Sequence, residues 1–297
     1  MAKLLSFLKS KKIILYILYF ICVFVISLYL TFPFNQLRPL IESKMSAALH
    51  RPITFKSIDT HYITGIELDD LAILDTAANN EPIFKAEKIS VFINPFSLIM
   101  GSYSGYFGIY ALGGITSGSF SSTGSHCIVD IDFKNINPKL FSFLVTKNYV
   151  IDAKINGSIN GDFSIADFTK SNGSLSFDAK KFNIEKLSLS TPLGPFAFPE
   201  LSFSSFITGA SLKDENIDVK KIELEGKSAK IYIRDGIIKL ANNLADARLN
   251  LKLEFSLDDE LKNRFGVIVD QFCSYNTSTN LYSLKLSGSL LSPTATK

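Results

Sequence analysis

Histidine and cysteine are scarce in this chain of 297 residues, which has three of each and no tryptophan. None of the histidines, His50, His61 and His126, belongs to an H-x-x-x-H or H-E-x-x-H pair, and no Cys-x-x-Cys occurs. Structural and catalytic metal sites usually draw their ligands from such closely spaced pairs. The sequence therefore predicts no metal site.

Sequence motifs of common enzymes are missing as well. There is no G-x-S-x-G, no Walker loop and no G-x-G-x-x-G followed by a helix. The glycine-rich stretch from Gly113 to Gly118 sits between two strand-like runs, where turn formation explains it. Asp59 and His61 lie two apart on a predicted strand and are interpreted as a surface pair. We expect no catalytic residue, no cofactor and no enzymatic activity.

The few cysteines do not form a disulfide framework. Cys22 lies in an apolar N-terminal run, and Cys127 and Cys273 lie far apart in the remainder. Small disulfide-rich domains have many cysteines at short spacings. The sequence leaves open whether Cys127 and Cys273 pair or remain two separate core residues.

An excess of basic charge is absent from the predicted folded part. The chain has 31 Lys and Arg against 28 Asp and Glu, and four of the lysines lie within residues 1–12, where there is no acid. Removing these four leaves 27 bases against 28 acids in residues 33–297, a net charge of −1. Nucleic-acid-binding proteins carry a basic face on the folded domain. We therefore expect no nucleic-acid partner.

One long hydrophobic run is present, from Ile13 to Phe32, with 20 residues and no charge. A helix of that length is about 30 Å long, which matches the hydrocarbon core of a bilayer. Because lysines precede the run, the positive-inside rule predicts a cytoplasmic tail (1–12), a transmembrane helix (13–32) and an exported domain (33–297). A cleaved signal peptide would have a shorter core and a small-x-small site, which Leu28–Phe32 does not offer.

Beyond the anchor, the pattern predicts a short amphipathic helix and then mostly strands. Leu37, Ile41 and Met45 recur at helical spacing within 34–49, and from Ile53 the period changes to two. Further short helices are expected at 95–100, 138–147 and 258–264. The fold class is mainly β: a long, curved antiparallel sheet with few short helices.

Two strands alternate with unusual regularity. In 151–165 and 247–257 the apolar side chains occupy odd positions and polar ones the even positions. Strands with one solvent-exposed face and one apolar face are typical of antiparallel sheet. The predicted helices are too few to cover the apolar faces, so the sheet either closes as a sandwich or barrel, or curls into a trough that something apolar fills. The candidate lipid-facing residues are Ile151, Ile155, Ile159, Phe163, Leu249, Leu251, Leu253 and Phe255.

Several short motifs resemble one known family. They are the anchor running into Phe32-Pro33, the helix ending at Leu49–Ile53, the strand Gly65–Ile73, the strand and turn Ile89–Ile99, the Gly113–Gly118 element and the closing strand Tyr282–Pro293. Together they are similar to the type II secretion system protein N family of the AsmA-like superfamily, although Ala111-Leu112 stand where that family usually has a tyrosine. The resemblance implies an inner-membrane protein with a periplasmic AsmA-like β domain.

Three functions are compatible with this pattern. The resemblance implies a component associated with type II secretion whose trough binds or shuttles lipid, with membrane lipids and other secretion-system or envelope proteins as partners. A second hypothesis is a scaffold that docks other secretion components and binds no lipid. A third is an envelope adhesin-like sandwich, which a cleaved N-terminus would favour.

Overall fold

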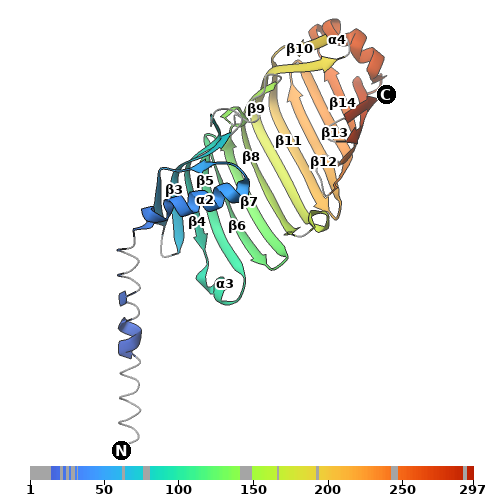
Figure 1. Cartoon of the computed structure of the whole chain (residues 1–297). Coiled ribbons are helices and arrows are strands. Elements are labelled where there is room, and N and C mark those ends of the chain that lie inside the picture. Colours follow the sequence, from blue (N-terminus) through green and yellow to red (C-terminus); the bar gives the residue numbers. More distant parts are fainter. Residues whose placement is uncertain are drawn as a thin grey trace, which may run out of the picture.

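The structure is a computed structural model of the whole chain. It describes residues 15–20, 23–24, 27, 31, 33–61, 64–75, 81–140, 149–165, 167–191, 194–241, 247–289 and 293–297. All strands within these residues join one antiparallel sheet, which is long, curved and not closed (Figure 1). The prediction of a mainly β protein is confirmed, and the alternative of a closed sandwich or barrel is wrong.

The first half of the sheet is built from consecutive hairpins. Its strands are β1 (Ile53–Thr54), β2 (Ser57–His61), β3 (Gly65–Asp75), β4 (Glu81–Ile93), β5 (Tyr103–Ala111), β6 (Gly114–Thr123), β7 (His126–Ile136) and β8 (Tyr149–Ser164). β1 and β2 both pair with β3, so they form one interrupted strand at this end. From β3 to β8 each strand pairs with the next one in the chain.

The second half continues the same order with two small departures. Its strands are β9 (Asn172–Thr191), β10 (Gly194–Phe198), β11 (Leu201–Lys213), β12 (Asn216–Gly226), β13 (Ala229–Lys239), β14 (Arg248–Leu257), β15 (Ser274–Asn276), β16 (Leu281–Ser289) and β17 (Pro293–Thr296). β9 pairs with β8 on one side, and with β10 and β11 on the other. β14 pairs with β16, and β15 and β17 form the last edge.

The hairpin turns use backbone conformations with positive φ. Leu112 and Gly113 connect β5 to β6 with φ of 56° and 70°, as the tight turns of β-hairpins require. Asp70 also has a positive φ, 50°, but it lies inside β3, and the strand continues past it to Asp75.

Helices are few and short, as predicted. The described ones beyond Pro33 are the 3-10 turn η1 (Phe34–Leu37), α2 (Arg38–Leu49), α3 (Pro95–Ile99), the 3-10 turns η2 (Pro138–Leu140) and η3 (Phe168–Lys170), and α4 (Asp259–Phe272). Of the helix predicted at 138–147, only η2 lies within the described residues. The helix predicted at 258–264 was placed too short, because α4 continues to Phe272.

Half of the predicted membrane anchor, 13–32, falls outside the described residues. Those of its residues that are described, 15–20, 23–24, 27 and 31, are helical. The side chains of Leu15 to Phe20 are all more than half exposed. Within the described part of the chain, we find no helix with the length and apolar character needed to cross a membrane.

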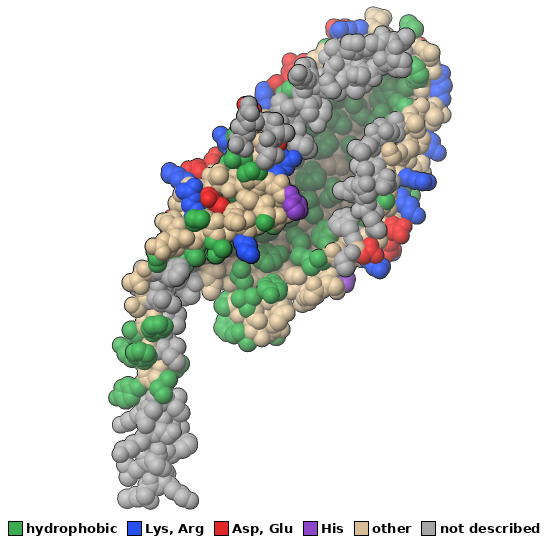
Figure 2. Space-filling model, in the orientation of Figure 1, with side chains coloured by type: hydrophobic (Ala, Val, Ile, Leu, Met, Phe, Trp, Pro, Cys, Tyr) green, Lys and Arg blue, Asp and Glu red, His purple; other side chains and the backbone are tan. Residues whose placement is uncertain are grey.

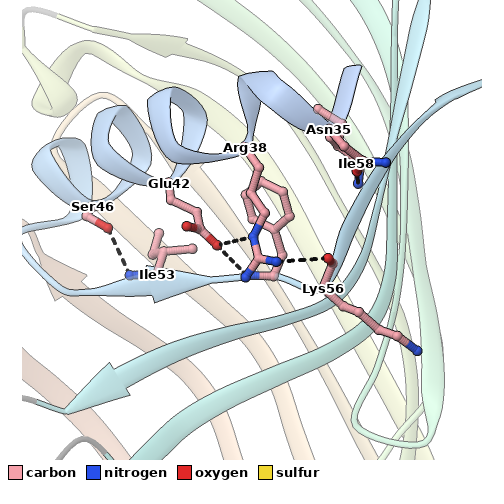
Figure 3. Close-up of polar contacts among 8 residues, drawn as sticks. Asn35, Arg38, Glu42, Ser46, Ile53, Lys56 and Ile58 are labelled. Carbon is pink, nitrogen blue, oxygen red and sulfur yellow. Dashed lines mark hydrogen bonds and ion pairs between the residues drawn. The ribbon is translucent and has the colours of Figure 1, made fainter. Parts of the chain in front are cut away.

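Polar side chains of η1 and α2 replace strand partners along β1 and β2 (Figure 3). The carbonyl Oδ1 of Asn35 accepts from the amide of Ile58 at 3.1 Å, and the hydroxyl of Ser46 accepts from the amide of Ile53 at 2.9 Å. Between them, Glu42 Oε1 accepts from the amide of Phe55 and from Arg38 Nε, both at 3.0 Å. Buried amides need such acceptors, so these contacts hold α2 along the first edge of the sheet.

Apolar contacts complete the docking of α2. Its Ile41 and Met45, with Phe34 of η1, pack on a buried cluster from the first strands. The members of this cluster are Ile53, Phe55, Ile58, Leu68, Leu71, Ala86 and Ala111. The sheet therefore has one core under α2.

A second core lies under α4. Leu261, Phe265 and Val269 recur every fourth residue, so they share one face of the helix. They pack against a cluster from β8 to β13, which consists of Ala153, Ala179, Phe182, Leu201, Phe203, Leu224 and Ala229. Asp258 caps the helix, its Oδ1 accepting from the amide of Leu261 at 2.9 Å, as aspartate commonly does at a helix N-terminus.

Candidate functional site

One face of the sheet is apolar from strand to strand. Directly paired residues of neighbouring strands lie on the same face, so the pairing can be followed across the sheet. One row contains only apolar residues and glycine: Ile66, Val91, Phe107, Gly118, Ile131, Ile159, Leu175, Ala210, Val219 and Gly236. This row crosses ten strands, which at about 4.8 Å per strand amounts to roughly 40 Å.

The opposite face is polar along the neighbouring row. That row contains Glu67, Ser90, Gly108, Ser117, Asp132, Ser158, Ser176, Gly209, Lys221 and Arg234. Ion pairs form on this face, including Lys88 with Glu67 at 2.6 Å and Lys221 with Glu223 at 2.8 Å. The hydrogen bond from its ammonium to Glu67 raises the pKa of Lys88. The two faces therefore differ in chemistry over the length of the sheet.

Figure 2 shows hydrophobic side chains gathered in the hollow of the curved sheet. The two helices cover parts of this face, α2 over the first strands and α4 over one margin of β8 to β13. We call the apolar groove the part between them, lined by Val91, Phe107, Ile131, Phe133, Ile159, Leu175, Phe177, Ile233 and Leu253. All nine side chains are half-buried, because their neighbours in the sheet shield them and no second layer packs on them in the described residues.

Glycines in the sheet leave room for aromatic rings in the groove. Phe133 and Phe177 flank Gly157 in the pairing, and their ring centroids are 5.6 Å apart. A Cβ on Gly157 would lie 2.3 Å from Cδ1 of Phe177, and one on Gly118 would lie 2.3 Å from the carbonyl oxygen of Asp130. Real Cβ atoms essentially never come so close, so a side chain at either position would force the neighbouring ring or strand to move.

The predicted lipid-facing residues all lie on this apolar face, but in different surroundings. Ile155 pairs with Ala179, and the row continues through Phe206, Leu224, Ile231 and Phe255. Ile151 and Ile155 pack against the core under α4. Ile159 pairs with Ile131 and Leu175 in the open middle.

The remaining candidates extend the face toward β7 and the last strands. Phe163 pairs with Cys127, Leu249 with Ile238, and Leu253 with Ile233 and Leu284. Phe255 stacks on Tyr282 with centroids 5.5 Å apart. Leu251 is only 8% exposed and lies against Gly236, so it belongs to the floor of the sheet and offers little surface to a ligand.

Several lining residues were not among the predicted ones. Val91, Phe107, Ile131 and Phe133 come from β4, β5 and β7, where apolar side chains such as Phe92, Tyr106 and Ile128 also occupy the other face, so the alternation there is weaker than in 151–165. What the sequence did not show is that β4, β5 and β7 continue the face of β8. That follows only from the pairing of strands.

No reactive chemistry accompanies the groove in the described residues. Cys127 and Cys273 are separate free thiols, and burial raises the pKa of the Cys273 thiol, which disfavours a nucleophilic thiolate. His126 contacts Asp162 at 3.0 Å on the exposed side of the sheet. Within the described part of the chain, no three His, Cys, Asp or Glu side chains are placed to hold a metal ion.

The comparisons with known proteins add no relative. No family model, no curated protein and no solved structure matches the chain. The resemblance to the type II secretion system protein N family stays a prediction from the motifs. The fold defines the chain as a protein with an open, curved antiparallel sheet that is apolar on its hollow face.

Proposed function

We propose that this protein is a membrane-anchored envelope protein whose β domain holds the acyl chains of lipids in the apolar groove. The observation that carries the proposal is the row of apolar side chains and glycines across ten strands, whose middle, at Ile131, Ile159 and Leu175, is packed under neither helix within the described residues. An apolar surface of that extent on a soluble domain marks a site for an apolar partner. A bound lipid covers this surface while the protein transfers or stores that lipid.

The dimensions of the groove suit a lipid tail. The hydrocarbon core of a bilayer is about 30 Å thick, so one acyl chain spans roughly 15 Å. The apolar row is longer than this, and its uninterrupted character lets a chain slide without meeting a charge. Burying each CH₂ contributes about 0.8 kcal/mol, so a single acyl chain supplies enough free energy for binding.

The anchor and the location are part of the same proposal. Residues 1–12 face the cytoplasm, 13–32 cross the inner membrane and the β domain is periplasmic, in association with type II secretion and its envelope partners. The apolar run with lysines on one side supports this orientation. Alkaline phosphatase fused after Lys297 should be active in cells, whereas a fluorescent protein that matures only in the cytoplasm should stay dark there. The reverse pattern would exclude the orientation.

The test of lipid binding uses the full chain purified in mild detergent and examined by native mass spectrometry. We expect the wild type to retain phospholipid and Ile159→Glu to lose most of it, because a carboxylate in the middle of the groove must be desolvated against acyl chains. Ile159 is half-buried and touches no helix core, so the change alters the groove more than the fold.

Asn160→Glu is the matched control, because Asn160 is the next residue on β8 and its side chain is exposed on the polar face. It adds the same charge at nearly the same place along the sheet. If the wild type retains no lipid, or if Ile159→Glu and Asn160→Glu retain it equally, the proposal is contradicted and a scaffold without lipid is favoured.

A further inference from the structure

The connection between β4 and β5 exposes an unusual number of large apolar side chains. We call it the α3 tip, and its exposed members are Phe96 (73%), Leu98 (48%), Ile99 (83%), Met100 (83%) and Tyr103 (61%). Single exposed apolar residues are ordinary on protein surfaces, but a contiguous group marks an interaction site.

The α3 tip is built with its polar groups inward. Asn94 Oδ1 accepts from the amide of Phe96 at 3.0 Å and caps the helix. The Ser97 side chain is buried, donating to the carbonyl of Asn94 at 2.7 Å and accepting from the amide of Ser104 at 3.1 Å. A surface helix normally buries its apolar side and exposes its polar side. Here the arrangement is reversed, and hydrogen bonds hold it.

The sequence around the tip has no charge. No Lys, Arg, Asp or Glu occurs between Lys88 and Asp130, a stretch that includes the end of β4, α3, β5 and β6. On the outer face of the sheet, Tyr106 of β5 and Ile128 of β7 are also exposed, at 63% and 57%. Exposed tyrosines beside aliphatic side chains, without charges, are typical of segments at a membrane interface.

The N-terminal segment joins the sheet at the same ends of the strands as the tip. Along β1 and β2, η1 bonds Ile58, while the last turn of α2 bonds Ile53. Pro33 therefore lies toward the His61 end of β2. That end pairs with the start of β3, which pairs in turn with the end of β4, directly before α3. The predicted anchor and the tip thus leave the sheet on one side.

We propose that the α3 tip inserts into the outer leaflet of the membrane that holds the anchor, as a second attachment beside it. The occupant is the lipid bilayer, because an uncharged, ordered group of Phe, Ile, Met and Tyr side chains fits the interface between headgroups and acyl chains. The anchor and the tip, attached at the same ends of the strands, fix the tilt of the sheet relative to the bilayer. The inference uses the anchor of the proposed function and is independent of lipid in the groove.

The absence of tryptophan makes a direct test possible. Full-length Ile99→Trp and Met100→Trp each carry a single tryptophan on the tip, and Val267→Trp carries one at a position on α4 that is 86% exposed. The proteins are placed in phosphatidylcholine nanodiscs, with or without bromine on the acyl chains. At a depth of about 5–10 Å the indole reaches the bromines, so we expect about a twofold loss of fluorescence for both tip variants and almost none for Val267→Trp.

Two results would overturn the inference. One is emission from both tip variants that is as unquenched and red-shifted as that of Val267→Trp. The other is blue-shifted emission without quenching by bromine, which would show that the tip contacts protein. Repeating the Ile99→Trp measurement with Ile159→Glu present separates the two proposals, because quenching by the bilayer persists whether or not the groove holds lipid.

Discussion

Phe265→Ala should lower the free energy of unfolding by about 3–5 kcal/mol, the usual cost of emptying a buried aromatic site. Phe265 is 3% exposed and is the central residue of α4 on the core formed by Ala153, Phe182 and Phe203. Its loss leaves a cavity that the neighbouring alanines cannot fill. Leu261 and Val269 alone then hold the helix on the sheet.

Val267→Ala is the control for this prediction. Val267 lies two residues away on the same helix and is 86% exposed, so its truncation should change stability by less than about 0.5 kcal/mol. Urea unfolding of the full chain in detergent, followed by circular dichroism, measures both. Equal effects of the two changes would show that α4 does not pack on the sheet as described.

Phe55→Ala should have a comparable effect at the other core, again about 3–5 kcal/mol. Phe55 is 1% exposed, and the Arg38 guanidinium lies over its ring, 5.7 Å from the centroid. Arg38 in turn bonds Glu42, which accepts from the Phe55 amide (Figure 3). Removing the ring therefore loosens both the apolar and the polar attachment of α2.

Because α2 connects the predicted anchor to the sheet, this change should also free the helix. Limited proteolysis should cut Phe55→Ala within 34–49 faster than the wild type, whereas Leu49→Ala, whose side chain is 53% exposed, should match the wild type. An unchanged cleavage rate in Phe55→Ala would mean that α2 is held by its hydrogen bonds alone.

Much of the fold could be predicted because strand alternation is a local property. The odd positions of 151–163 and 249–257 fall on the apolar face, since successive side chains point to opposite sides of a strand. The turn at Gly101 and the cap at Asp258 also follow from short-range chemistry. These features depend on residues a few positions apart.

The end of α4 shows where local signals fail. Gly266 and the β-branched residues after it favour a strand or a break by propensity, yet the helix continues to Phe272. Phe265 and Val269 bury apolar surface against strands far away in the sequence. Tertiary burial outweighs the local preference, which is about 1 kcal/mol at Gly266 and less at each β-branched position.

The candidate site, too, could be predicted from the sequence only in part. The sequence by itself determined that the chain has one apolar and one polar strand face, one long uncharged N-terminal run and no motif for chemistry. Only the tertiary structure decided that the apolar faces join into one open groove, that Leu251 lies in its floor and that α3 turns its apolar side outward. The reason is that the neighbours of a face are set by pairing and curvature across the whole sheet, which no period within a single strand specifies.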